Sequence, residues 1–167
     1  ACLEYLLEKG LDGVDPEKAS AAWSSWEEQE EVIRKIFKGK PGHLERALSE
    51  SRDKYLPPEG IRRQLVKLKA AWPGLSEEIR KQIFPLAEIK EKLRLAGAPY
   101  EPEHIGISRE KLRCTFRGIP YMRSRFTSVD LLHRAGVLGE VEARLFGKGG
   151  LDVGGAGGRA GGEAVAR

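Results

Sequence analysis

Residues that start and stop helices recur along the chain, and they constrain its fold more than any other feature. Asp15 followed by Pro16 has the form of an N-cap with proline in the first turn. Ser25 and Glu28 have the spacing of a capping box, and Gly39 stands where the helix after them would stop. No segment combines alternating apolar and polar residues with β-branched enrichment and turn signals at both ends. We therefore predict an all-α, bundle-like domain of short helices joined by proline and glycine.

The same signals predict the bounds of the helices. Segment 16–37 is one helix or two, and the capping box at Ser25 favours a fresh start there. Pro73 and Gly74 are predicted to turn the chain, so that one helix ends at Trp72 and Ser76 caps the next. We expect helices over residues 1–9, 16–37, 58–72, 76–84, 86–96 and 128–135. A further helix begins at Pro41 and is ended by residues 55–58, and another is capped by Ser108 and is ended or kinked by Gly118 and Pro120.

Apolar residues at helical spacing predict which faces are buried. Trp23 and Trp26 are three residues apart, a spacing more typical of core aromatics than of a ligand cage. In the helix that Ser108 caps, Phe116 is expected to face inward. The buried stripe expected in helix 86–96 consists of Leu86, Ile89, Leu93 and Ala96.

Length and composition divide the chain into two parts. The 167 residues include 40% hydrophobic ones, which is enough for the core of one domain. We expect residues 1–146 to form the helical domain and residues 147–167, mostly Gly and Ala, to be a disordered tail. Because the chain opens with what reads as the last turns of an amphipathic helix, we expect it to be the C-terminal fragment of a longer polypeptide.

Charge and cysteine content narrow the class of protein. The 29 basic and 25 acidic residues are interspersed, so the net charge of +4 is weak evidence for a nucleic-acid partner, and we expect none. Cys2 and Cys114 are too few and too far apart for a metal or disulfide framework, which fits a reducing cytosol. No apolar run approaches the 18 or so residues of a membrane span. We therefore expect a soluble, cytoplasmic protein without a membrane partner.

The densest group of specific features is the stretch 120–133. Thr127 and Asp130 form a variant capping box, and Gly136 stands where a left-handed residue would end the helix 128–135. Arg123 and Arg125 therefore lie directly before a helix N-terminus, where a phosphate or carboxylate is favoured. The alternative is that both arginines pair with carboxylates of neighbouring helices, as most exposed arginines do.

Other candidate residues carry weaker signals. His43, His104 and His133 have no second ligand at helical spacing, and no known metal or nucleotide motif is present. His104, beside Glu103, is the histidine to test as an acid or base, although a solvated or locally hydrogen-bonded side chain is the more ordinary interpretation. The basic face with Arg62, Arg63, Lys67 and Lys69 lacks interleaved aromatic residues, which favours a solvated surface.

From about residue 85 to residue 138 the chain resembles the C-terminal part of the bacterial sn-glycerol-1-phosphate dehydrogenases, relatives of glycerol dehydrogenase, iron-containing alcohol dehydrogenases and dehydroquinate synthase. The resemblance covers several short motifs in the same order and at the same spacing. They are L-R-L-A-G-A-P at 93–99, P-E-H-I-G-I-S at 102–108, L-R at 112–113, M-R-S-R-F-T at 122–127, V-D-L-L at 129–132 and G-V-L at 136–138.

The resemblance implies the family's α-helical C-terminal domain and an oxidoreductase that interconverts dihydroxyacetone phosphate and glycerol 1-phosphate. It implies NAD(P) and a divalent metal, zinc or nickel, as cofactors, and a homo-oligomer. The family's nucleotide site and metal ligands match no residue here, so no catalytic, cofactor or metal residue is assigned, and the fragment alone is expected to be inactive. Arg123 and Arg125 are the candidates for the substrate phosphate. The alternative is a stand-alone helical binding module with a basic surface around Arg62, Arg63, Lys67, Arg123 and Arg125.

Overall fold

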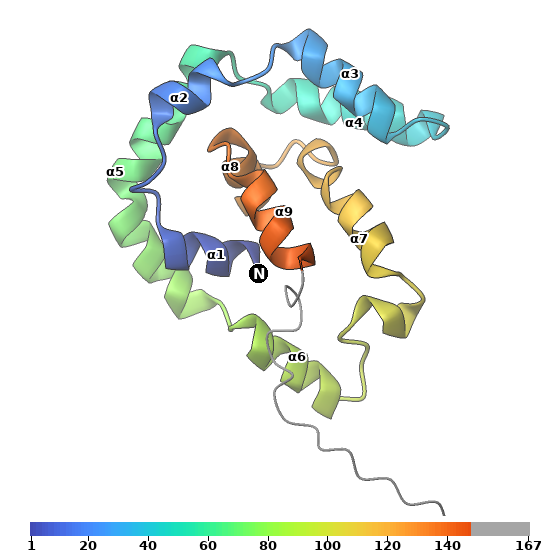
Figure 1. Cartoon of the computed structure of the whole chain (residues 1–167). Helices are drawn as coiled ribbons and strands as arrows, with labels where there is room; N and C mark the ends of the chain where they lie inside the picture. The colour runs from blue at the N-terminus through green and yellow to red at the C-terminus, as the bar shows by residue number, and fades with distance from the viewer. Residues whose placement is uncertain (148–167) are drawn as a thin grey trace, which may run out of the picture.

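The computed structural model describes residues 1–147, and over this range the chain is all-α, as predicted. Long α5 lies on one side, α3 and α4 form a pair at one end, and α8 and α9 lie in the middle (Figure 1). The elements are α1 (Cys2–Lys9), α2 (Pro16–Ala21), α3 (Trp26–Ile36), α4 (Pro41–Lys54), α5 (Pro58–Gln82), α6 (Leu86–Leu95), η1 (Pro102–Ile105), α7 (Arg109–Phe116), η2 (Ile119–Tyr121), α8 (Ser128–Arg134) and α9 (Leu138–Phe146).

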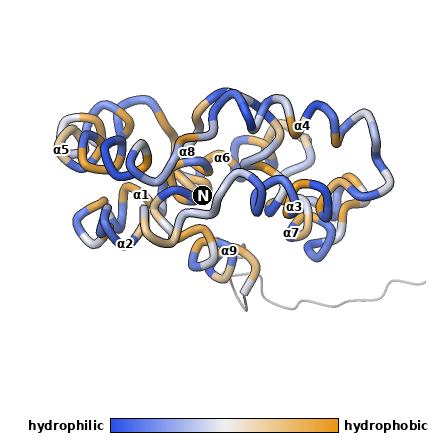
Figure 2. The backbone as a smooth tube through the Cα atoms, turned by 90° about the horizontal axis from the view of Figure 1, so that it is seen from above, coloured by the Kyte–Doolittle hydropathy of each residue, from blue (hydrophilic) through white to orange (hydrophobic). Residues whose placement is uncertain are grey.

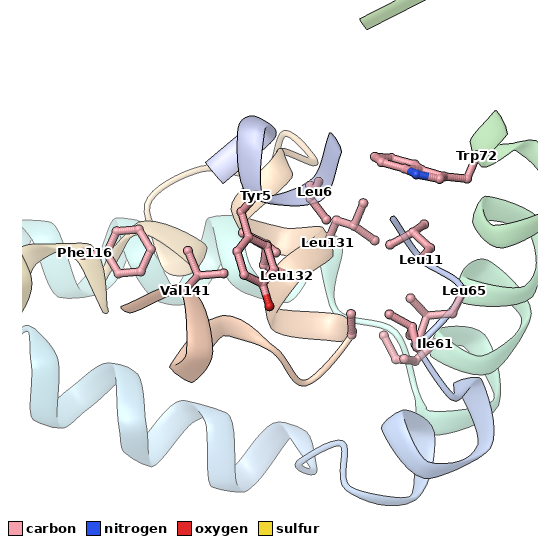
Figure 3. Close-up of a cluster of buried hydrophobic side chains, with 12 residues drawn as sticks. Tyr5, Leu6, Leu11, Ile61, Leu65, Trp72, Phe116, Leu131, Leu132 and Val141 are labelled. Atoms are coloured by element: carbon pink, nitrogen blue, oxygen red, sulfur yellow. The ribbon is translucent and has the colours of Figure 1, made fainter. Parts of the chain in front are cut away.

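The main core joins segments from both ends of the described chain. Leu6 of α1, Leu65 of α5, Leu132 of α8 and Val141 of α9 are fully buried and meet in one cluster (Figure 3). The helices that form this cluster each present an apolar face to it, and hydrophobic and hydrophilic residues accordingly alternate along them (Figure 2). A second cluster lies between α3, α4 and η2 and consists of Ile33, Phe37, Ala47 and Tyr121. Residues near both ends of the described chain therefore depend on the same core.

Most predicted helix starts are confirmed. The segment 16–37 forms two helices, and Ser25 caps the second with Glu28 in a capping box. Asp15 accepts hydrogen bonds from two backbone N–H groups of the first turn of α2. Trp23 and Trp26 are partly buried against the two clusters, as expected of core aromatics. The tail predicted for 147–167 lies outside the described residues except for Gly147, which ends α9.

The turn predicted at Pro73 and Gly74 is wrong. α5 continues through both residues to Gln82, and Ser76, expected to cap a new helix, lies inside it. Trp72 and Ser76 are buried and Ile79 packs against the core, so one face of α5 stays in contact across the proline. A proline in a helix interior costs about 3 kcal/mol. Burial of the apolar side chains on this face outweighs that cost. Pro73 itself lies on the exposed side of α5.

The buried stripe predicted for α6 is also wrong, although the helix bounds agree closely. None of its residues is buried, and Ile89 and Ala96 are exposed, while Leu86 and Leu93 are only partly covered. Leu95 is 71% exposed. The spacing identified an amphipathic helix correctly, but in the described structure its apolar side is at most partly covered. No helix in the described part of the chain is both long and apolar enough to cross a membrane.

Candidate functional site

The arginine loop, residues 122–126, connects η2 to α8, and its end is fixed by the predicted capping box. The Thr127 hydroxyl accepts a hydrogen bond from the Asp130 N–H at 3.4 Å, and the Asp130 carboxylate accepts one from the Thr127 N–H at 2.8 Å. Gly136 follows α8 with a φ of 75°, the left-handed conformation expected there. The loop therefore enters α8 in the arrangement that the sequence predicts.

Arg123 and Arg125 are exposed, and neither forms a hydrogen bond or ion pair with any residue in 1–147. Most other described arginines have such partners. Arg34 pairs with Glu30 at 2.5 Å, for example, and Arg117 pairs with Glu142 at 2.7 Å. Pairing with neighbouring helices, the alternative interpretation of the two arginines, therefore does not occur within the described structure. Both guanidinium groups remain available to an external anion.

One face of α4 holds the arginine loop in place. The Ser124 N–H donates to the Glu50 carboxylate at 2.5 Å. Hydrogen bonding with Ser124 holds the pKa of Glu50 below its usual range. Ser51 donates from its hydroxyl to the Tyr121 carbonyl at 3.3 Å. Lys54 Nζ and Asp130 Oδ1 are 2.6 Å apart in a buried ion pair. These three α4 residues lie 70 or more positions from their partners, so no local sequence pattern indicated them.

A surface hollow of about 220 Å³ lies between α4 and the arginine loop. Its lining consists of His43, Arg46, Ala47, Met122 and Arg123. The hollow therefore brings one predicted site residue, Arg123, together with two basic residues that the sequence did not assign to a site. Arg125, the other predicted residue, is not part of this lining.

A buried polar cluster lies behind the loop. Arg134 donates to the Lys54 carbonyl at 2.6 Å and also to the Gln64 side chain. His133 lies between two aromatic rings, with centroid distances of 5.0 Å to Trp23 and 5.9 Å to Tyr121. The pKa of His133 is lowered to about 4, mainly by burial; Asp130 opposes this shift, and the cations Arg134 and Lys54 contribute to it. The imidazole is therefore neutral at pH 7.

The neutral state of His133 predicts a pH-dependent stability. The folded-state pKa of about 4 lies below the ordinary value of 6.5, so the unfolded chain binds the extra proton first. The contribution of neutral His133 to the free energy of unfolding is complete above pH 6.5 and is lost as the pH falls toward 4. The loss reaches about 3 kcal/mol. Urea unfolding between pH 4 and pH 7 should show a smaller loss for His133→Phe than for the wild type. A His104→Phe control should follow the wild type, and equal slopes for all three proteins would contradict the assignment.

The other two histidines are more exposed. His104 accepts a hydrogen bond from the Tyr100 N–H at 3.4 Å, and its ring contacts the Tyr100 ring. This agrees with the local hydrogen bonding that was the ordinary interpretation, and it gives no acid or base partner. His43, which the sequence left unassigned, lines the hollow beside Arg123.

The basic face of α5 is partly neutralised. Arg62 makes ion pairs with Glu59 at 2.8 Å and with Glu17 at 3.2 Å. Lys69 donates to the backbone carbonyls of Asp12 and Val14. Of the residues proposed for a basic surface on this helix, Arg63 and Lys67 keep their charges without such partners in the described structure.

Metal ligands do not gather in the described part of the chain. Within residues 1–147 no group of three or more His, Cys, Asp and Glu side chains lies close enough to hold a metal ion. Cys2 and Cys114 are both free thiols. The arginine loop and the adjacent hollow form the candidate site, and their exposed guanidinium groups suit an anionic ligand.

Comparison of the chain with models of protein families, with curated proteins and with solved structures finds no match.

Proposed function

We propose that this chain is the C-terminal helical part of an NAD(P)-dependent sn-glycerol-1-phosphate dehydrogenase, in which the arginine loop binds the phosphate of the substrate. The reaction interconverts dihydroxyacetone phosphate and glycerol 1-phosphate. The proposal starts from the resemblance of residues 85–138 to that family. The all-α architecture is compatible with it.

The observation that supports the proposal most directly is that Arg123 and Arg125 are exposed and unpaired within residues 1–147. Both belong to the motif M-R-S-R-F-T at 122–127, both are exposed, and neither has a carboxylate partner within 1–147. Guanidinium groups bind phosphate through two parallel hydrogen bonds, so a loop that keeps two of them unpaired suits a phosphorylated substrate. Glu50 holds the middle of this loop, at Ser124, to α4, and Asp130 holds Thr127, the residue that follows the loop, at the start of α8.

The described residues do not fit the family's metal ion, because no ligand group is present among them. In this proposal the metal and the nicotinamide belong to other parts of the complete enzyme. The role of this chain is then to bind the substrate phosphate and to form one wall of the active-site cleft of the complete enzyme. The 167-residue chain alone is accordingly expected to be inactive.

Replacing Arg123 with glutamine tests the proposed role in the complete enzyme that the proposal assumes. A charge-assisted hydrogen bond contributes about 1.5–3 kcal/mol, so the KM for dihydroxyacetone phosphate should rise about 10- to 100-fold in Arg123→Gln. Arg125→Gln measures the second arginine in the same assay. Arg63→Gln, which removes another exposed and unpaired arginine, is the matched control and should leave the KM unchanged.

An unchanged KM in both arginine-loop variants would show that the two arginines do not bind the substrate phosphate. If the longer wild-type protein did not oxidise NADH or NADPH, the proposed dehydrogenase activity would be contradicted. The alternative, a helical binding module with a basic surface, would then be favoured. It is weakened at present because Arg62, one of its five proposed residues, is paired with Glu59 and Glu17.

A further inference from the structure

The hollow beside the arginine loop has a lining with two kinds of surface. His43, Arg46 and Ala47 lie at positions i, i+3 and i+4 of α4, which places them on one face of that helix. Met122 and Arg123 face them from the arginine loop. Arg46 and Arg123 carry positive charges, His43 supplies ring nitrogens for hydrogen bonds, and the other two side chains are apolar. The hollow therefore offers cationic groups next to a small apolar wall.

The polar side chains of this lining have few hydrogen-bond or ion-pair partners within residues 1–147. Arg123 and His43 form no hydrogen bond or ion pair with another residue in 1–147. Arg46 contacts Glu50 only through Nε, at 3.4 Å, and its side chain is 73% exposed. Glu50 in turn accepts the Ser124 N–H at 2.5 Å. No acidic side chain belongs to the lining, so the positive charge is not neutralised inside the hollow.

The backbone adds to this positive charge. The first turn of the 14-residue helix α4 contains no acidic residue, and no side chain caps its N-terminus. Capping boxes occupy the corresponding positions of α3 and α8. The partial positive charge of the α4 N-terminus therefore remains available on the side where His43 stands.

We propose that this hollow binds a small phosphomonoester, with Arg123, Arg46 and His43 around the phosphate and with Met122 and Ala47 against the carbon chain. Two guanidinium groups supply planar pairs of donors, which suit a tetrahedral oxyanion better than a single ammonium group. The assignment adds two α4 residues to the site, neither of which the family resemblance identified. It rests on the proposed function for the choice of glycerol 1-phosphate as the ligand, but the hollow itself does not depend on dehydrogenase activity.

Calorimetric titration of the 167-residue chain with glycerol 1-phosphate, and separately with inorganic phosphate, tests this inference. Arg123→Gln should weaken binding of glycerol 1-phosphate at least 10-fold, and His43→Gln should weaken it several-fold. Arg63→Gln and His104→Gln remove an unpaired arginine and an exposed histidine elsewhere, so both should bind within twofold of the wild type. Circular dichroism of each variant confirms that it is folded.

Equal affinity in the wild type, Arg123→Gln and His43→Gln would overturn the inference, as would the lack of any binding by the wild type. Equal affinity for inorganic phosphate and glycerol 1-phosphate would overturn the contact with the carbon chain. Failure of the proposed function gives a different result, in which the 167-residue chain binds glycerol 1-phosphate while the longer protein has no dehydrogenase activity. If the longer protein is active and its KM for dihydroxyacetone phosphate is unchanged in His43→Gln and Arg123→Gln, the hollow does not bind the substrate. The proposed dehydrogenase activity would then stand without this site.

Discussion

Asp130→Ala should lower the free energy of unfolding by about 3–5 kcal/mol, because it leaves the buried Lys54 ammonium without its counter-charge. The two groups are 2.6 Å apart, and both side chains are largely buried. The same carboxylate accepts hydrogen bonds from the N–H and the hydroxyl of Thr127, so the substitution also removes the Asp130 half of the capping box of α8. Domains of this size are stable by only about 5–15 kcal/mol, so the loss should be large in urea unfolding.

Asp15→Ala is the matched control for the loss of a cap. Asp15 accepts backbone N–H groups at the start of α2 but is exposed, so its removal should cost only about 1 kcal/mol. Equal losses in Asp15→Ala and Asp130→Ala would show that the ion pair with Lys54 contributes nothing. A double variant, Lys54→Met with Asp130→Leu, should recover part of the loss, because it removes both charges together.

Leu132→Ala should destabilise the chain by about 2–5 kcal/mol, the usual cost of a cavity at a fully buried leucine. Leu132 is 0% exposed and lies in the main core between α1, α8 and α9 (Figure 3). Leu95→Ala removes the same atoms from α6, where the side chain is 71% exposed. Its effect should stay within about 0.5 kcal/mol.

Ile89→Ala tests whether the predicted stripe of α6 is exposed, because Ile89 belongs to that stripe and is 40% exposed. If Ile89→Ala cost as much as Leu132→Ala, the stripe would be buried in the isolated chain, as the spacing of its residues suggested. Chemical unfolding with an unchanged denaturant slope gives the comparison directly.

Local patterns predicted the helix ends well. The capping boxes at Ser25 and Thr127 and the left-handed Gly136 depend only on residues within one or two turns, so the sequence contains all the information that fixes them. The position of Arg123 and Arg125 before α8 follows from the same local signals.

Tertiary contacts decided the features that the sequence did not predict. Pro73 lies inside α5 because Trp72 and Ser76 keep one face of that helix in contact with the rest of the protein. The apolar residues of α6 have the spacing of a buried stripe whether or not another element covers them. His43 and Arg46 join Arg123 only when α4 packs against the arginine loop, and nothing in their own segment indicates that neighbour.

The most direct test of the proposed dehydrogenase is oxidation of NADH and NADPH in the presence of dihydroxyacetone phosphate. The 167-residue chain and the longer protein that the proposal assumes should be assayed side by side, each with added zinc or nickel. We predict activity in the longer protein alone, with its KM raised by Arg123→Gln and unchanged by Arg63→Gln. Lack of activity in both proteins, with helical circular dichroism spectra showing that both are folded, would contradict the proposal.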